Sequence, residues 1–126
     1  MKIQSENGEK FGYYLSTEII KSYYKLKETN TKSFEFNLQS NGRFECPIKF
    51  DIKNLKEGGY WLSEGKYDKL ISLGNIILSK NSIKQESHCN NNINLFEYHG
   101  IENPLCGKTG DTNIFTPKHI LVIQME

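Results

Sequence analysis

The chain has 126 residues, of which 37% are apolar and 25% are charged, and its formal net charge is +1. This length and composition favour one folded domain, here taken as residues 1–126, and exclude a disordered chain. The near-neutral charge excludes a global field that would attract polyanions. Arg43 is the only arginine, whereas phosphates and base edges are best recognised by guanidinium groups, so no nucleic-acid partner is expected.

The apolar residues are of types that favour β-sheet. The sequence has no alanine and a single valine, Val122, so isoleucine, leucine, phenylalanine and tyrosine supply nearly all of the apolar volume. Alanine is the best helix former, while β-branched and aromatic side chains fit the pleated surface of a sheet. The composition therefore predicts more strand than helix.

Two short segments have helical spacing. Residues 16–27 place Ile19, Ile20, Tyr23 and Tyr24 on one helical face, and Ser16 or Thr17 could cap the N-terminus. Residues 64–73 would form a shorter helix that Ser63 caps and Gly74 ends. We therefore predict one or two short helices.

The strongest strand signal lies between Ser33 and Ile52. Apolar residues alternate with polar ones on both sides of Ser40–Gly42, which predicts a hairpin with one buried face. A three-residue loop would pair Leu38 with Phe44 and Phe36 with Cys46, which keeps apolar side chains opposite one another, with Gly42 left-handed. The expected buried face consists of Phe34, Phe36, Leu38, Phe44, Cys46, Ile48 and Phe50.

Further strands are predicted over residues 76–78, 93–98 and 120–125, and the last is apolar on both faces, as in a central or covered strand. Gly58–Gly59 and residues 102–116 have the composition of loops. The predicted fold class is therefore α+β, a mainly antiparallel β-sheet with one or two short helices.

The sequence predicts a cytoplasmic protein. The segment Met1–Lys10 is polar rather than a charged and then apolar leader, and no window approaches the roughly 18 apolar residues of a membrane span. Membrane association is therefore not expected. Cys46, Cys89 and Cys106 are expected to be reduced thiols.

Two common ligand-binding patterns are rejected. Cys106–Thr109 resembles the end of a phosphate-binding loop, but Glu102 stands where that motif requires a glycine. The cysteines and histidines lack the paired spacing of a structural zinc site, since His88 and Cys89 are adjacent. We therefore predict neither a metal nor a cofactor.

A thiol nucleophile is the alternative that remains open. Cys106 lies in a predicted loop between His99 and His119, and a nearby imidazole could accept its proton while Asp111 orients that imidazole. No recognised nucleophile signature surrounds Cys106. A small enzyme or a small-ligand-binding domain is thus the second hypothesis for function.

The candidate partner-binding residues form two groups. Tyr60 and Trp61 follow a double glycine and could form an aromatic anchor. The second group flanks the long loop, where carboxylates could mimic phosphates in a basic cleft of a partner. It consists of Glu97, Tyr98, His99, Glu102 and Asp111.

The opening residues Met1–Glu9, MKIQSENGE, resemble the start of small bacterial immunity proteins that neutralise polymorphic or contact-dependent growth-inhibition toxins. The resemblance implies a non-enzymatic binding protein whose partner is a cognate toxin domain, as in toxin–antitoxin pairs. Immunity proteins share no common motif, so the resemblance transfers no residue roles. The resulting hypothesis is an inhibitor that occludes the active site of a nuclease-type toxin.

Overall fold

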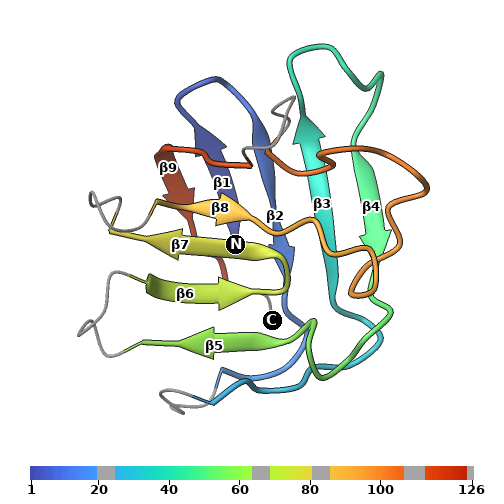
Figure 1. The fold of residues 1–126 in the computed structure, drawn as a ribbon, viewed down its shortest axis with the longest axis vertical. Helices are drawn as coiled ribbons and strands as arrows, with labels where there is room; N and C mark the ends of the chain where they lie inside the picture. Colours follow the sequence, from blue (N-terminus) through green and yellow to red (C-terminus); the bar gives the residue numbers. More distant parts are fainter. Residues whose placement is uncertain (20–24, 64–68, 81–85, 107–112, 125–126) are drawn as a thin grey trace.

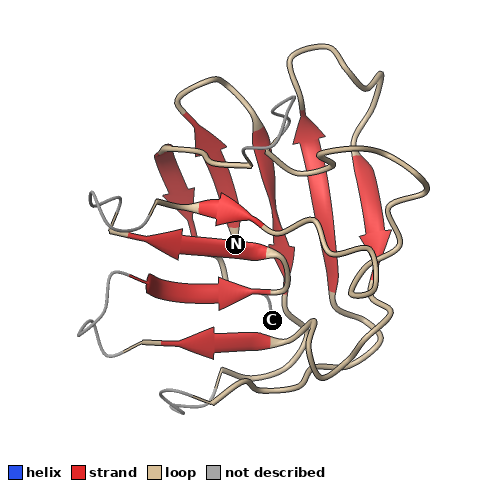
Figure 2. Ribbon diagram, in the orientation of Figure 1, coloured by secondary structure: helices blue, strands red, loops and turns tan. Residues whose placement is uncertain are grey.

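The computed structural model describes residues 1–19, 25–63, 69–80, 86–106 and 113–124. These residues form two antiparallel sheets, and none of them is helical. The five-stranded sheet has the order β4-β3-β2-β1-β9, and the four-stranded sheet has the order β5-β6-β7-β8. Figure 1 shows the strands of the smaller sheet running across those of the larger one, and Figure 2 draws the described residues outside the strands as loops and turns.

The strands are short, with long connections between several of them. The five-stranded sheet comprises β1 (Lys2–Ser5), β2 (Lys10–Tyr14), β3 (Phe34–Gln39), β4 (Ile48–Asp51) and β9 (Pro117–Leu121). The four-stranded sheet comprises β5 (Tyr60–Leu62), β6 (Lys69–Leu73), β7 (Ile76–Ser79) and β8 (His88–Cys89).

The core lies between the two sheets. Ile3, Phe11 and Phe50 from the larger sheet pack in one cluster with Leu73 and Ile76 from the smaller one. Residues 90–106, the segment that follows β8, add apolar side chains of their own to this cluster, among them Leu95, Phe96 and Leu105. Phe115, which precedes β9, joins the same cluster. The segment that follows β8 is therefore anchored in the core, although none of residues 90–106 belongs to a strand.

The prediction of antiparallel sheet is confirmed, but the predicted helices are absent from the described residues. In the first segment, residues 16–19 and 25–27, on either side of residues 20–24, are not helical. Lys27 instead exchanges two backbone hydrogen bonds with Tyr60, at 2.7 and 2.9 Å. Ile20, Tyr23 and Tyr24 lie outside the described residues. In the second segment, residues 64–68 lie outside the described residues and Lys69–Leu73 is strand β6. The fold class is therefore all-β.

The register predicted for the β3–β4 hairpin is wrong. Phe36 pairs with Lys49 rather than Cys46, and the connection runs from Ser40 to Pro47 instead of three residues. The face of β3 is also inverted, because Glu35 and Asn37 are 0% and 1% exposed while Leu38 is 39% exposed. The polar side chains point inward because each forms hydrogen bonds in the interior.

The strand predicted near the C-terminal end was expected to be covered, but β9 is an edge strand. Ile120, Leu121, Val122 and Ile123 are 48–71% exposed. Among the described strands, β9 pairs with β1, which the sequence pattern did not identify as a strand. Within the described ranges, no helix has the length and apolar character that a membrane span requires.

Candidate functional site

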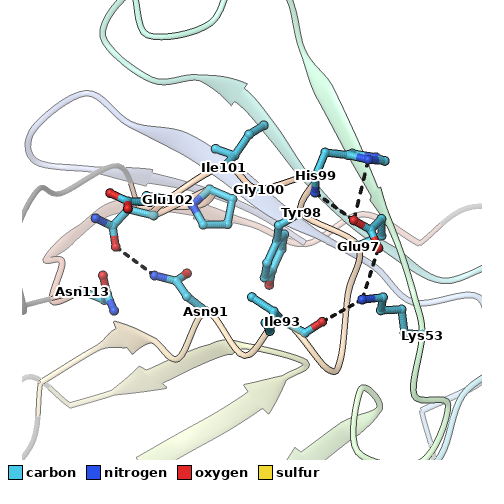
Figure 3. Close-up of a pocket in the computed structure, with 12 residues that line it drawn as sticks. Lys53, Asn91, Ile93, Glu97, Tyr98, His99, Gly100, Ile101, Glu102 and Asn113 are labelled. Atoms are coloured by element: carbon cyan, nitrogen blue, oxygen red, sulfur yellow. Dashed lines mark hydrogen bonds and ion pairs between the residues drawn. The ribbon is translucent and has the colours of Figure 1, made fainter.

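The segment that follows β8, residues 90–106, lines a surface pocket of about 500 Å³. Most of the lining residues come from residues 91–104, while Lys53 and Asn113 complete the wall from elsewhere in the chain. Figure 3 shows side chains of the segment arranged around this hollow, with Tyr98 between His99 and Ile93. A pocket of this size falls within the usual range for ligand-sized clefts.

The backbone of the pocket is strained at several points. Asn91, His99 and Asn103 adopt positive φ angles of 52°, 54° and 47°, and Gly100 adopts 76°. A non-glycine residue in this region costs about 1–3 kcal/mol, so other contacts must hold the loop in place. Backbone strain of this kind clusters at binding and catalytic sites.

Two side chains from the β3–β4 region fix the far end of the loop. The Asn37 amide nitrogen donates to the backbone carbonyls of Pro104 and Leu105, at 3.0 Å each. Arg43 donates to the carbonyls of Glu102 and Asn103, at 3.1 and 2.7 Å. The single arginine of the chain therefore supports the pocket backbone.

A buried polar network fixes the floor of the pocket. Tyr98 donates a hydrogen bond to the Glu35 carboxyl group, and the backbone amide of Asn75 donates to the same group at 2.8 Å. Asn75 also donates to the carbonyl of Asn92 at 3.1 Å. Gly74 permits this approach, because its φ is +55° and a Cβ atom there would lie 2.8 Å from a Glu35 carboxylate oxygen.

Burial dominates the electrostatics of this network. Loss of solvent raises the pKa of Glu35 to about 8, although hydrogen bonds from Tyr98 and Asn75 oppose the shift. Burial, followed by the charge of Glu35, also raises the pKa of Tyr98. Burial therefore favours the neutral form of the carboxyl group that supports the pocket floor.

The rim of the pocket carries an exposed ion-pair cluster. Lys53 lies 3.1 Å from the Glu97 carboxylate and donates to the carbonyl of Ile93 at 3.1 Å. The backbone amide of His99 donates to the other Glu97 oxygen at 3.0 Å. The His99 hydrogen bond, and then Lys53, lower the pKa of Glu97. Glu97 is thus ionised and oriented at the rim.

The structure brings together part of the predicted partner-binding set. Glu97, Tyr98, His99 and Glu102 all line the pocket, with Tyr98 buried and Glu102 exposed. Asp111 lies outside the described residues. The predicted aromatic pair lies on β5 at the opposite edge of the smaller sheet from β8, where Tyr60 is 2% exposed and Trp61 is half-buried.

The thiol considered as a nucleophile is not at the pocket surface. Cys106 is 1% exposed, and its sulfur donates to the carbonyl of Asn113 at 3.4 Å. His99 lies at the pocket rim, and His119 lies exposed on β9. Among the described residues, no group of three or more His, Cys, Asp and Glu side chains is placed to hold a metal ion.

Several residues of the site escaped the sequence analysis. Asn91 and Asn103 carry the strained backbone and are joined by a side-chain hydrogen bond of 3.0 Å. Asparagine tolerates left-handed backbone better than most residues, so the Asn90–Asn92 run was a usable signal. Lys53 and Asn113 carried no comparable signal, because both reach the pocket through tertiary packing.

Replacing Asn37 with alanine tests whether the buried amide holds the loop. The variant loses two hydrogen bonds to buried carbonyls, so we expect it to be about 2–4 kcal/mol less stable than wild type. Hydrogen exchange should accelerate most over residues 90–106. The exposed control Asn94→Ala should change stability by less than about 0.5 kcal/mol. Equal effects of both substitutions would contradict the supporting role.

A comparison of the chain with protein-family models, curated proteins and solved structures found no match.

Proposed function

We propose that this domain is a non-enzymatic protein-binding module and that its contact surface surrounds the pocket of residues 91–104. The observation that carries the proposal is a strained surface loop held in place by hydrogen bonds from two buried side chains and one exposed side chain. Asn37 and Arg43 bind its carbonyls, and Asn75 fixes its start. A preordered surface loses less conformational entropy when a partner binds.

The rim offers groups suited to a partly basic partner. Glu97 and Glu102 present carboxylates, and His99 and Gly100 beside them are exposed. Exposed carboxylates next to a surface pocket can accept hydrogen bonds from lysine or arginine side chains. The proposed partner is a toxin domain of the nuclease type, and this assignment also draws on the resemblance of Met1–Glu9 to immunity proteins.

The test is direct binding to a toxin candidate. The C-terminal domain of the protein encoded immediately upstream would be purified, and its affinity for the wild-type chain measured by calorimetry. We expect tight binding that weakens as salt is added, because surface charge pairs are screened. The absence of any binding would rule out that domain as the partner.

Variants locate the interface. Ile93 lines the pocket and is 67% exposed, so Ile93→Arg adds bulk and positive charge there with little effect on folding. We expect it to weaken binding at least about tenfold, as does the double variant Glu97→Ala, Glu102→Ala. Val122→Arg, at a 71% exposed position on the chain beyond β9, is the matched control. If wild type binds and neither pocket variant weakens it, the interface lies elsewhere, with Tyr60 and Trp61 next in order.

A further inference from the structure

Two of the three thiols are neighbours in the core. Cys89 ends β8 at the start of the pocket segment, and Cys106 stands at the other end of that segment. Each is 1% exposed. The backbone amide of Cys89 donates to the carbonyl of Asn113 at 2.9 Å, and the sulfur of Cys106 donates to the same oxygen at 3.4 Å. One carbonyl oxygen therefore contacts both cysteines.

The electrostatics agree with this placement. Burial raises the pKa of the Cys89 thiol well above its usual value, and a hydrogen bond with the Cys106 thiol raises it further. Cys46 differs from both, because it is exposed on the connection between β3 and β4. The chain thus contains one buried pair of thiols and one exposed thiol.

We propose that Cys89 and Cys106 are a redox-convertible pair whose intramolecular disulfide closes the base of the pocket segment. None of the three cysteines forms a disulfide in the structure described above, which corresponds to the reduced form. The bond would join the two ends of residues 89–106, the segment that carries Glu97, Tyr98 and His99. Oxidation would therefore add a covalent restraint to the pocket.

The chemistry requires a small-molecule disulfide as the oxidant. One cysteine thiolate attacks the small disulfide, forms a mixed disulfide and releases one small thiolate. The second cysteine thiolate then attacks the protein sulfur of the mixed disulfide and displaces the second small thiolate. Two electrons pass from the cysteine pair to the oxidant, and the two cysteine protons end on the released small thiols. The oxidant reaches the buried pair when the segment opens or before the chain has folded.

The experiment refolds the wild-type chain in a glutathione redox buffer. Disulfide connectivity is mapped by mass spectrometry after free thiols are blocked. The expected result is a Cys89–Cys106 bond with Cys46 free or carrying a single glutathione. If the three cysteines paired without regard to the fold, Cys46 would also be joined to Cys89 and to Cys106. Such a mixture, or glutathione on all three sulfurs, would overturn the proposal.

A second measurement separates a native bond from a distorting one. In a Cys46→Ser background, the oxidised chain should melt about 5–15 °C above the same chain treated with dithiothreitol, because the bond restricts the unfolded chain. The control variants Cys46→Ser, Cys89→Ala and Cys46→Ser, Cys106→Ala retain one thiol each and should show no such difference. An oxidised chain that melts below its reduced form would show that the bond distorts the fold, and would contradict the proposal.

Discussion

The Glu35→Gln variant is expected to be less stable than wild type at acidic pH and more stable than wild type at alkaline pH. The Glu35 pKa of about 8 in the folded chain lies above the ordinary value of 4.5. Between these values the folded chain holds a proton that the unfolded chain has released, so the wild-type stability falls as the pH rises. The loss is complete above about pH 8 and amounts to at most about 5 kcal/mol, at 1.36 kcal/mol for each pKa unit.

The glutamine side chain carries no charge at any pH, so the stability of the variant should not fall in this way as the pH rises. At pH 5 it should be less stable than wild type by about 1 kcal/mol, because the amide cannot reproduce both hydrogen bonds to Tyr98 and Asn75. At pH 9 it should be the more stable chain. Urea unfolding at a series of pH values would measure both curves.

The control is Glu97→Gln at the exposed pocket rim. Hydrogen bonding and Lys53 lower the Glu97 pKa, so the contribution of Glu97 to stability is lost as the pH falls, whereas that of Glu35 is lost as the pH rises. The Glu97→Gln variant should therefore still lose stability toward alkaline pH, as wild type does. A Glu35→Gln variant that kept the wild-type slope would show that another group causes it.

Phe50→Ala is expected to cost about 3–5 kcal/mol, a large share of the stability of a domain this size. Phe50 is 0% exposed, and its ring meets Tyr98 edge-to-face with centroids 5.1 Å apart. The substitution therefore leaves a cavity next to the pocket floor. Chemical denaturation of purified variants would measure the cost.

Phe36→Ala is the matched comparison in the neighbouring strand. Sequence alternation placed Phe36 in the core, but its ring is half-buried on the outer face of the five-stranded sheet, over Gly12. We expect a cost of about 1–2 kcal/mol, since much of the ring is already in contact with water. A cost equal to that of Phe50→Ala would contradict the orientation of β3.

Much of the strand content was predictable because alternation and turn residues are local signals. Phe34–Leu38 and Ile76–Leu78 were recognised as strands, and both are strands. The direction of the β3 side chains was not predictable, because apolar side chains are normally assigned to the interior. Here Glu35 and Asn37 occupy it, since the loop after β8 and the β6–β7 turn supply their hydrogen-bond partners.

The helices were predicted from spacings that tertiary pairing overrides. In residues 69–73, the spacing of Leu70 and Ile71 suited a helix, but the segment lies between β5 and β7 and pairs with both. The candidate site was partly predictable, because Glu97, His99 and Glu102 were chosen for their place beside the predicted loop of residues 102–116. The strand predicted over residues 93–98 is wrong, since Phe96 forms only an isolated bridge with Ile52. The sequence could not predict the roles of Lys53, Arg43 and Asn113, because these residues reach the pocket only when the sheets have packed.

The pairing of β9 with β1 has a consequence for folding kinetics. Ile3 pairs with Ile120, so the edge of the five-stranded sheet joins segments from opposite ends of the described chain. Contacts between such distant segments are slow to form, because the entropy of closing the intervening chain is lost before the contacts stabilise it. During synthesis on the ribosome, β1 therefore keeps one unpaired edge until residues 117–121 emerge. We expect refolding on the millisecond-to-second scale, with protection of the Ile3 amide region among the last events.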